Sequence, residues 1–244
     1  MKIDASGMQY RRLNELIHSA VDGGEKEIII DNVNGQRYIG DGLSGNVVMQ
    51  INGVPGNDLA AFMDGPTLMV NNNAQDGVGN TMNSGKVVVN GDAGDIVGYA
   101  MRGGEIYIRG SVGYRAGIHM KAYRSSYPEI VIGGRARDFL GEYMAGGLLI
   151  VLGLGESSNG PLVGNYVGTG MHGGEMYIRG KVEKHQLGME VRIDVPNEED
   201  YKRIRRPMEE FCSRFSLSLE EVMKGEFTKL APFSHRPYGQ VYAY

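Results

Sequence analysis

The chain has 244 residues and a formal net charge of −4 with charges of both signs, which gives no electrostatic basis for binding nucleic acid or an anionic membrane. Its single cysteine, Cys212, rules out an intrachain disulfide, a thiolate-held iron–sulfur cluster and a cysteine-based zinc site. The first residues contain no apolar signal-peptide core, and the longest apolar stretch, residues 146–154, is too short to span a bilayer, so we expect a cytoplasmic protein.

Residues 1–43 are expected to form a helix followed by a short strand. Apolar residues from Met8 to Val21 recur at three- and four-residue steps, and Gly23-Gly24 follows, which is typical of an amphipathic helix with a glycine stop. Residues 26–31, with isoleucines at their centre, read as a strand.

Residues 44–192 form an array of repeats marked by a column of methionines. These column methionines are Met63, Met82, Met101, Met120, Met144 and Met171. The first four follow one another at a constant step of 19, and the last two steps lengthen to 24 and then 27. We therefore expect polar loops inserted into two coils, at residues 123–128 and 155–161. Short apolar runs recur in step, at 47–51, 68–70, 87–89, 106–108, 130–132, 148–152 and 176–178.

A fixed period of this length, with one β-rich run and several glycines per repeat, indicates a solenoid. So short a coil, with two or three short strands, cannot bury both faces alone, so it must stack on its neighbours. The sequence therefore predicts an all-β fold, a single-stranded parallel β-helix of about 19-residue coils with short helical flanks; its right hand is taken from the crossover rule. Stacking would place Asn52, Asn71 and Asn90 in a ladder of side-chain amides that ends where Arg109 takes the next place.

Residues 193–244 change character. Asn197 followed by three acidic residues predicts the start of a helix, and Ser218 with Glu221 predicts a second, short one. Residues 229–244 show little periodicity and are expected to lie as a tail over the solenoid or a partner. We expect the terminal helices to cover the open coils at the two ends of the array.

Several features could carry chemistry, and each also has a simpler interpretation. We interpret the column methionines as deformable filler of a narrow interior rather than a soft-metal site. Glycine strings such as residues 91–94 lead into another strand and leave no room for the helix that a dinucleotide fingerprint needs. His119 and His172 each stand beside a column methionine, but coils two apart would separate them, so surface or turn histidines are the favoured interpretation.

Two sets of charged residues are candidates on the outside of the prism. Asp76 and Asp95, with Asp138 at the matching place, could bind a cation or act as paired carboxylates on a polysaccharide, but turn-capping aspartates are favoured because the chain contains no tryptophan for a sugar platform. Glu105 and Arg109 recur as Glu175 and Arg179 in similar strings. Period-two alternation puts them on the outer face, where either an ion-paired surface or a partner-docking face remains open.

The repeated Gly-Gly-x-Ile-x-Ile-x-Gly-x-x-Gly-x-x-x-Gly-x-x-Met pattern resembles the glycine-repeat (GXGXG) β-helix domain of glutamate synthase, in the free-standing form found where the large subunit is split. The segments at residues 31–43 and 4–8 also look like that family. The β-helical subunit of formylmethanofuran dehydrogenase carries a very similar repeat, and the N-terminal segment favours the first resemblance.

The glutamate synthase resemblance implies a structural role. In that family an amidotransferase hydrolyses glutamine, and ammonia passes through a tunnel to an FMN-containing synthase, where it adds to 2-oxoglutarate and the imine is reduced to glutamate. The β-helix would hold these two partners in register, with FMN and an iron–sulfur cluster on the synthase subunit. The chain begins Met1-Lys2 rather than with a nucleophilic cysteine, so no catalytic, cofactor-binding or metal-binding residue is carried onto it. The alternatives are a formylmethanofuran dehydrogenase-like subunit and a carbohydrate-active β-helix that uses Asp76 and Asp95. Self-association remains open.

Overall fold

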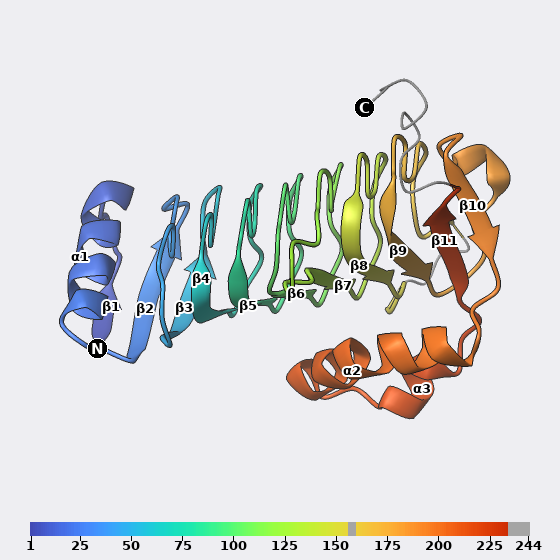
Figure 1. Cartoon of the computed structure of the whole chain (residues 1–244). Coiled ribbons are helices and arrows are strands. Elements are labelled where there is room, and N and C mark those ends of the chain that lie inside the picture. The colour runs from blue at the N-terminus through green and yellow to red at the C-terminus, as the bar shows by residue number, and fades with distance from the viewer. Residues whose placement is uncertain (156–159, 234–244) are drawn as a thin grey trace, which may run out of the picture.

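The computed structural model describes residues 1–155 and 160–233, and they form a parallel β-solenoid. The strands of this part of the chain belong to one sheet, in the order β1-β2-β3-β4-β5-β6-β7-β8-β9-β11-β10. Neighbouring strands from β1 to β9 are parallel, so each coil adds one strand to the sheet, as Figure 1 shows. The predicted all-β β-helix is confirmed.

Each predicted apolar run lies in, or overlaps, a strand. The strands are β1 (Lys2–Asp4), β2 (Glu27–Asn34), β3 (Val48–Val54), β4 (Asp64–Val70), β5 (Ser84–Val89), β6 (Glu105–Ile108), β7 (Glu129–Ile132), β8 (Ala145–Val151), β9 (Gly173–Ile178), β10 (Val191–Asp194) and β11 (Thr228–Pro232). A 3₁₀ turn, η1, spans Lys184–Gln186. The β2–β3 pairing is already parallel, so the ladder begins on the N-terminal side of residue 44.

The register of the ladder reproduces the sequence period. Lys86 pairs with Glu105, a step of 19, whereas Glu105 pairs with Glu129 and Leu148 with Glu175, steps of 24 and 27. The two insertions therefore leave the coils above and below them in register. In the first, Tyr123 and Ser126 exchange backbone hydrogen bonds of 3.0 and 2.9 Å in a tight turn. The second, at residues 155–161, lies largely outside the described residues.

The interior of the solenoid is a narrow stack of apolar side chains. All six column methionines are completely buried, together with inward-facing apolar side chains of the parallel strands β2 to β9. A flexible thioether fills irregular space at low cost, because its three rotatable bonds adapt to the coils on either side. The burial agrees with the interpretation of these methionines as core filler.

The prediction of two or three short strands in each coil is wrong: among the described residues each coil from β3 to β9 adds one strand to the sheet, and the residues before each methionine are not extended. The residues one, three and five positions before Met101 are Ala100, Gly98 and Ile96. Their φ values of 50°, 69° and 53° lie in the left-handed region. These alternating left-handed residues send their N–H groups to the neighbouring coils in turn, Ile96 to Tyr114 O at 2.8 Å and Gly98 to Val78 O at 2.7 Å. The backbone is thus hydrogen-bonded to both neighbours without an extended strand.

The two ends of the solenoid are closed differently. At the N-terminal end, α1 (Tyr10–Asp22) lies beyond β1 and buries Leu13, Ile17 and Ala20 against the first coils, as predicted (Figure 1). At the C-terminal end the prediction is wrong. The helix α2 (Glu198–Phe215) lies along the outer face of the sheet, with the short α3 (Leu219–Met223) beside it.

A strand, rather than the expected helices, covers the open coil at the C-terminal end of the solenoid. β11 pairs antiparallel with β9, so it covers the edge of the last parallel strand, and β10 pairs with its other side. The expectation of an irregular tail from residue 229 is therefore wrong as far as Pro232, because Leu230 is drawn into the core and fixes the strand. The rest of the predicted tail, residues 234–244, lies outside the described residues.

The asparagine column is partly confirmed. Asn71 Nδ2 donates to Asn52 Oδ1 at 2.7 Å, one coil apart. Arg109 does not simply end the column, because its guanidinium donates to Asn90 Oδ1 at 2.9 Å. At the N-terminal end of the column, Asn52 Nδ2 donates to Asp31 Oδ1 at 2.6 Å. This bond extends the column by one coil that the pattern of amides did not indicate.

Candidate functional site

The predicted aspartate column caps the corners of the coils. The Oδ1 atom of Asp76 accepts the backbone N–H of Asp95 at 2.9 Å, and that of Asp95 accepts the N–H of Tyr114 at 2.8 Å. Asp138 accepts the N–H of Asn165 at 2.8 Å in the longest of the coils. Each carboxylate thus satisfies a donor in the next coil, which is the favoured turn-capping interpretation.

These caps explain why glycines recur in the motif. A Cβ at Gly94 or Gly113 would lie 2.0 Å from the carboxylate oxygen of Asp76 or Asp95, and one at Gly164 would lie 2.1 Å from that of Asp138. The carboxylate occupies the space that a side chain would need. A parallel column, which the sequence analysis missed although it has the same period, consists of Asn73, Asp92 and Ser111.

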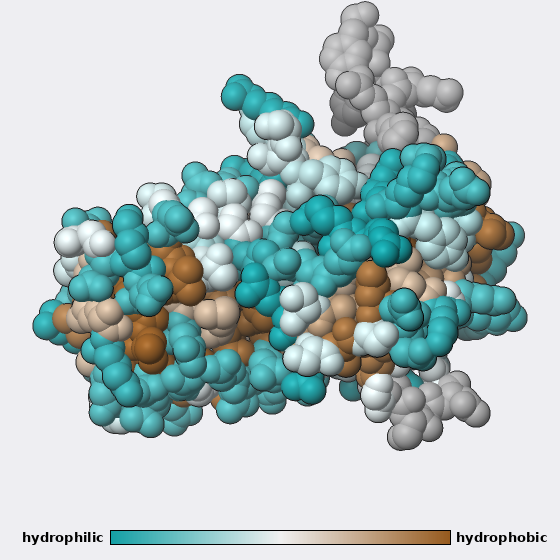
Figure 2. Space-filling view, turned by 90° about the horizontal axis from the view of Figure 1, so that it is seen from below, coloured by the Kyte–Doolittle hydropathy of each residue, from teal (hydrophilic) through white to brown (hydrophobic). Residues whose placement is uncertain are grey.

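The outer face of strands β5 to β9 is occupied by the chain's own helix α2. Arg206 of α2 donates to Glu105 at 2.7 Å and also to Glu129, while Arg203 pairs with Glu175. Lys86 of β5 pairs with Glu105 at 3.2 Å. Hydrophilic residues cover much of the α2 half of the molecule when it is seen from below, and hydrophobic surface shows between them (Figure 2).

Electrostatics on this face favour ionised carboxylates at two of three positions. Burial opposes ionisation of Glu105 and Glu175, but Arg206 and Lys86 outweigh it for Glu105, and Lys229 and Arg203 outweigh it for Glu175, so both carboxyls have lowered pKa values. Burial prevails at Glu129, whose pKa is raised.

The predicted Glu–Arg pairs do not form within the strands. Glu105 pairs with Lys86 and Arg206, and Arg109 points to Asn90. Arg179 donates from Nε to Val222 O at 2.9 Å, which ties α3 to the strand. Of the two interpretations left open, an ion-paired face is what the described residues show, and its ion pairs reach the chain's own helix.

Five aromatic rings and one arginine pack on one another from coil to coil near the column methionines. We call this set the aromatic edge: Tyr99, Arg115, His119, Phe139, Tyr143 and Tyr166. His119 stacks on Tyr143 with ring centroids 5.2 Å apart, and Phe139 stacks on Tyr166 at 4.9 Å. Tyr143 is 44% exposed and Tyr166 56% exposed.

Five of the six residues of the aromatic edge have a left-handed backbone, and Tyr99 is the exception. His119 and Tyr143 come one residue before a column methionine, and Arg115, Phe139 and Tyr166 come five before, all with φ between 52° and 63°. Such a φ is uncommon for a bulky residue and costs about 1–2 kcal/mol. The sequence analysis missed this surface, although counting back from the methionines would have found it.

The two candidate histidines are separate. His119 belongs to the aromatic edge, and His172 Nδ1 lies 3.2 Å from Gly170 O, two column methionines further on. Within residues 1–155 and 160–233, no cluster of three or more His, Cys, Asp or Glu side chains is arranged to hold a metal ion. Cys212 is buried in α2, and burial raises the pKa of its thiol.

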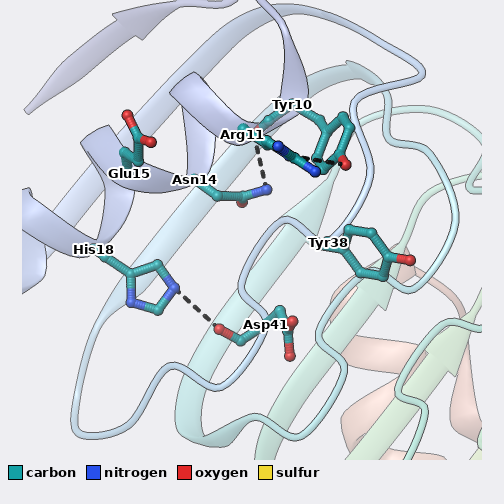
Figure 3. A pocket seen from close by; sticks show the side chains of 7 residues that line it. All are labelled: Tyr10, Arg11, Asn14, Glu15, His18, Tyr38 and Asp41. Carbon is teal, nitrogen blue, oxygen red and sulfur yellow. Dashed lines mark hydrogen bonds between the residues drawn. The ribbon is translucent and has the colours of Figure 1, made fainter.

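A shallow pocket of about 420 Å³ lies between α1 and the first coil (Figure 3). Its lining residues are Tyr10, Arg11, Asn14, Glu15, His18, Tyr38 and Asp41. Asn14 Nδ2 donates to the carbonyl oxygens of Tyr10 and Arg37, each at 2.9 Å, and His18 Nε2 lies 3.1 Å from Asp41 O. The contacts of Asn14 with Arg37 and of His18 with Asp41 fasten α1 to the solenoid, so the pocket is part of the end cap.

The match to a family covers most of the molecule just described. Residues 27–234 match the model of the family described as the GXGXG motif. The chain belongs to the GXGXG motif family. The matched range includes the glycines that leave room for the carboxylate caps. No helix among the described residues is both long enough and apolar enough to cross a membrane.

Two related sequences and one solved structure place the family match in context. The chain is 52% identical, over 98% of its length, to an uncharacterized protein of Methanocaldococcus jannaschii, of which it covers 95%. It is 34% identical, over 60% of its length, to ferredoxin-dependent glutamate synthase 2 of Synechocystis, of which it spans only 9%. Its fold resembles that of a chain in the formyltransferase/hydrolase complex (FhcABCD) of Methylorubrum extorquens, solved in complex with methylofuran. The TM-score is 0.64 at 18% identity, with 86% of this chain and 74% of the other covered.

Proposed function

We propose that this protein is the structural β-helix subunit of a split glutamate synthase. It would position a glutaminase-type amidotransferase and an FMN-containing synthase for glutamate biosynthesis from glutamine and 2-oxoglutarate, in the cytoplasm. The observation that carries the proposal is the family match over residues 27–234, together with the 34% identity to a segment of a glutamate synthase. FMN and an iron–sulfur cluster would belong to the synthase partner.

The architecture suits such a role. Each coil is bonded to the next by a strand ladder on one side and by carboxylate caps at a corner, so the solenoid is a rigid post along which surface positions keep fixed spacings. Since α2 covers the outer face of the sheet from β5 to β9, we assign partner contact to the aromatic edge. Aromatic side chains there are exposed and are held by stacking, so little rotamer freedom remains to be lost on binding.

Purification of the tagged full chain from its own host tests the assignment. We expect an amidotransferase polypeptide and a second polypeptide with the absorption of FMN to co-purify. Recovery of pterin-containing oxidoreductase subunits in their place would refute the glutamate synthase assignment. That result would support the second candidate, a β-helical subunit of a formylmethanofuran dehydrogenase-like oxidoreductase, which the likeness to the FhcABCD fold favours.

The contact surface is tested separately. Tyr143→Asn combined with Tyr166→Asn removes two exposed rings, and asparagine tolerates the left-handed backbone at both positions. We expect partner recovery to fall while the thermal midpoint stays within a few degrees of the parent. Tyr123→Asn, at an exposed ring on the first insertion, is the matched control and should retain the partners. Full recovery with the double variant would exclude the aromatic edge.

A further inference from the structure

The last strand of the sheet has an open side. β10 pairs with β11 along one edge, and among residues 1–155 and 160–233 no strand pairs with its other edge. Figure 1 shows β10 at the far end of the solenoid from α1. The N-terminal end is covered by the buried side of a helix, whereas this end presents a strand edge, which proteins usually cover, charge or shorten because it can pair with another chain.

Backbone groups of alternate residues point to this open side. Phe233 N–H donates to Glu190 O at 2.8 Å, which places Glu190 among the residues whose backbone faces β11. In an antiparallel strand the backbone N–H and C=O groups of successive residues point alternately to the two edges. The backbone groups of Arg192 and Asp194 therefore also point to β11, while those of Val191, Ile193 and Val195 point outward. Pro232, which has no N–H, lies opposite Val191, as this alternation requires. The N–H of Val191 is already bonded to Gly188 O at 3.2 Å.

The side chains around this edge are unusually apolar for an exposed position. Met189 is 91% exposed, Val195 89% and Ile193 45%. The side chains of Arg192 and Asp194 project from the other face of the sheet and form an ion pair of 2.7 Å. Arg192 also donates to Pro232 O at 2.8 Å. Isolated exposed apolar residues are common, but these lie on or directly beside a strand whose outer edge is unpaired among residues 1–155 and 160–233.

The order of residues along the edge is self-complementary. Val191-Arg192-Ile193-Asp194-Val195 reads the same in both directions except that the two charges exchange sign. When two copies are laid antiparallel with Ile193 opposite Ile193, each Arg192 faces the Asp194 of the other copy and each Val191 faces a Val195. We propose that two copies of this protein associate through the outer edges of β10 about a twofold axis at Ile193, an isologous contact of the kind that twofold symmetry requires.

The hydrogen-bonding groups fit the same register. Ile193 faces itself as an outward pair, so the two copies exchange both of their N–H to C=O bonds there. The N–H of each Val195 meets the C=O of Val191 in the other copy, which points to the same open side. The two nearest alternative registers that keep the outward backbone groups paired place Arg192 opposite Arg192 or Asp194 opposite Asp194. Repulsion between like charges disfavours both of these registers. Charge therefore selects one register, and the proposal is independent of the partners proposed above.

Charge reversal in the full-length chain tests this contact. Arg192→Asp alone places acidic side chains opposite acidic ones, and Asp194→Arg alone places basic side chains opposite basic ones. By sedimentation equilibrium we expect the parent to be a dimer and each single variant to dimerise at least about tenfold more weakly, the factor that corresponds to about 1.4 kcal/mol. An equimolar mixture of the two single variants restores opposite charges at every facing pair, and it should form heterodimers of parental affinity.

A second variant keeps the test independent of charge. Ile193→Pro removes an outward N–H, and an edge strand tolerates proline where the N–H faces away from the sheet. It should weaken the dimer while far-UV circular dichroism shows an unchanged solenoid. A monomeric parent at all concentrations, a dimer that every variant retains, a mixture that fails to re-associate, or an open filament formed by pairing of β10 with β1 would each overturn the proposal.

Discussion

Replacing Gly94 by alanine tests whether the carboxylate caps hold the coils together. A Cβ at Gly94 would lie 2.0 Å from Asp76 Oδ1, whereas ordinary contacts begin near 3.4 Å. The carboxylate must therefore retreat by the difference between these two distances, which breaks its 2.9 Å hydrogen bond to the N–H of Asp95. The φ of Gly94 is not among the left-handed values, so backbone strain adds nothing to this effect.

Two contributions set the expected loss of stability. Forcing an extra methyl group into a packed site costs about 1–3 kcal/mol. Loss of a side-chain cap on a backbone N–H costs about 1 kcal/mol. We therefore expect Gly94→Ala to lower the free energy of unfolding by about 2–4 kcal/mol, measured by urea denaturation followed by circular dichroism. Gly23→Ala, at the right-handed end of α1 with φ of −74°, is the control and should change stability by less than about 1 kcal/mol.

A double-mutant cycle separates the clash from the cap. Asp76→Ala alone loses the cap, at about 1 kcal/mol, and also removes the carboxylate oxygen that the new methyl group would approach most closely, so that only backbone atoms at 3.1 Å remain near it. The double variant should consequently be more stable than the sum of the single effects predicts, by at least about 1 kcal/mol. Additive effects, or a Gly94→Ala variant as stable as the control, would refute the idea that the glycine makes room for the carboxylate.

Three further predictions concern the core, the α2 face and the thiol. Met101→Ala should cost about 2–5 kcal/mol, because the methionine is completely buried, and a thermal melt with little change would place it outside the core. Glu175 has a folded-state pKa below its ordinary 4.5, so its stabilising contribution is present above that pH and is lost as the pH falls through the lower folded value. Glu175→Gln should thus lower the melting temperature at pH 7, with the difference from the parent vanishing in acid; a constant difference would contradict this. Cys212 should react with a thiol reagent much more slowly in the native than in the urea-unfolded chain, because the thiol is buried and its pKa raised.

The sequence period was sufficient to predict the fold because it is repeated many times. Each of the apolar runs from 47–51 to 176–178 coincides with a strand, and the steps of 19, 24 and 27 reappear as strand registers. The α1 helix and the starts of α2 and α3 followed from local rules, since Asn197 and Ser218 cap their helices as expected. Periodicity and capping are local properties, and a sequence displays them directly.

The position of α2 was not predictable in the same way. Its apolar side, with Ile204, Met208 and Phe211, shows that the helix must pack on something, but not on what. The partners that decide its place are far away in the chain: Arg206 meets Glu105 across 101 residues and Lys86 meets Glu210 across 124. The sequence predicted that the outer-face glutamates form either a docking face or an ion-paired face, and only the fold shows that Arg203 and Arg206 of α2 pair with them.

The caps also explain how the solenoid accommodates insertions without losing its register. Asp76 caps the N–H of Asp95 across a step of 19, and Asp138 caps the N–H of Asn165 across a step of 27, at the same corner of the coil. An insertion is therefore tolerated when it leaves the coil away from that corner. Since Arg115, Phe139 and Tyr166 follow the corner by a fixed step, their stacking continues past both insertions. A surface fixed in this way can keep its geometry while the loops change, as the proposed docking of partners on the aromatic edge requires.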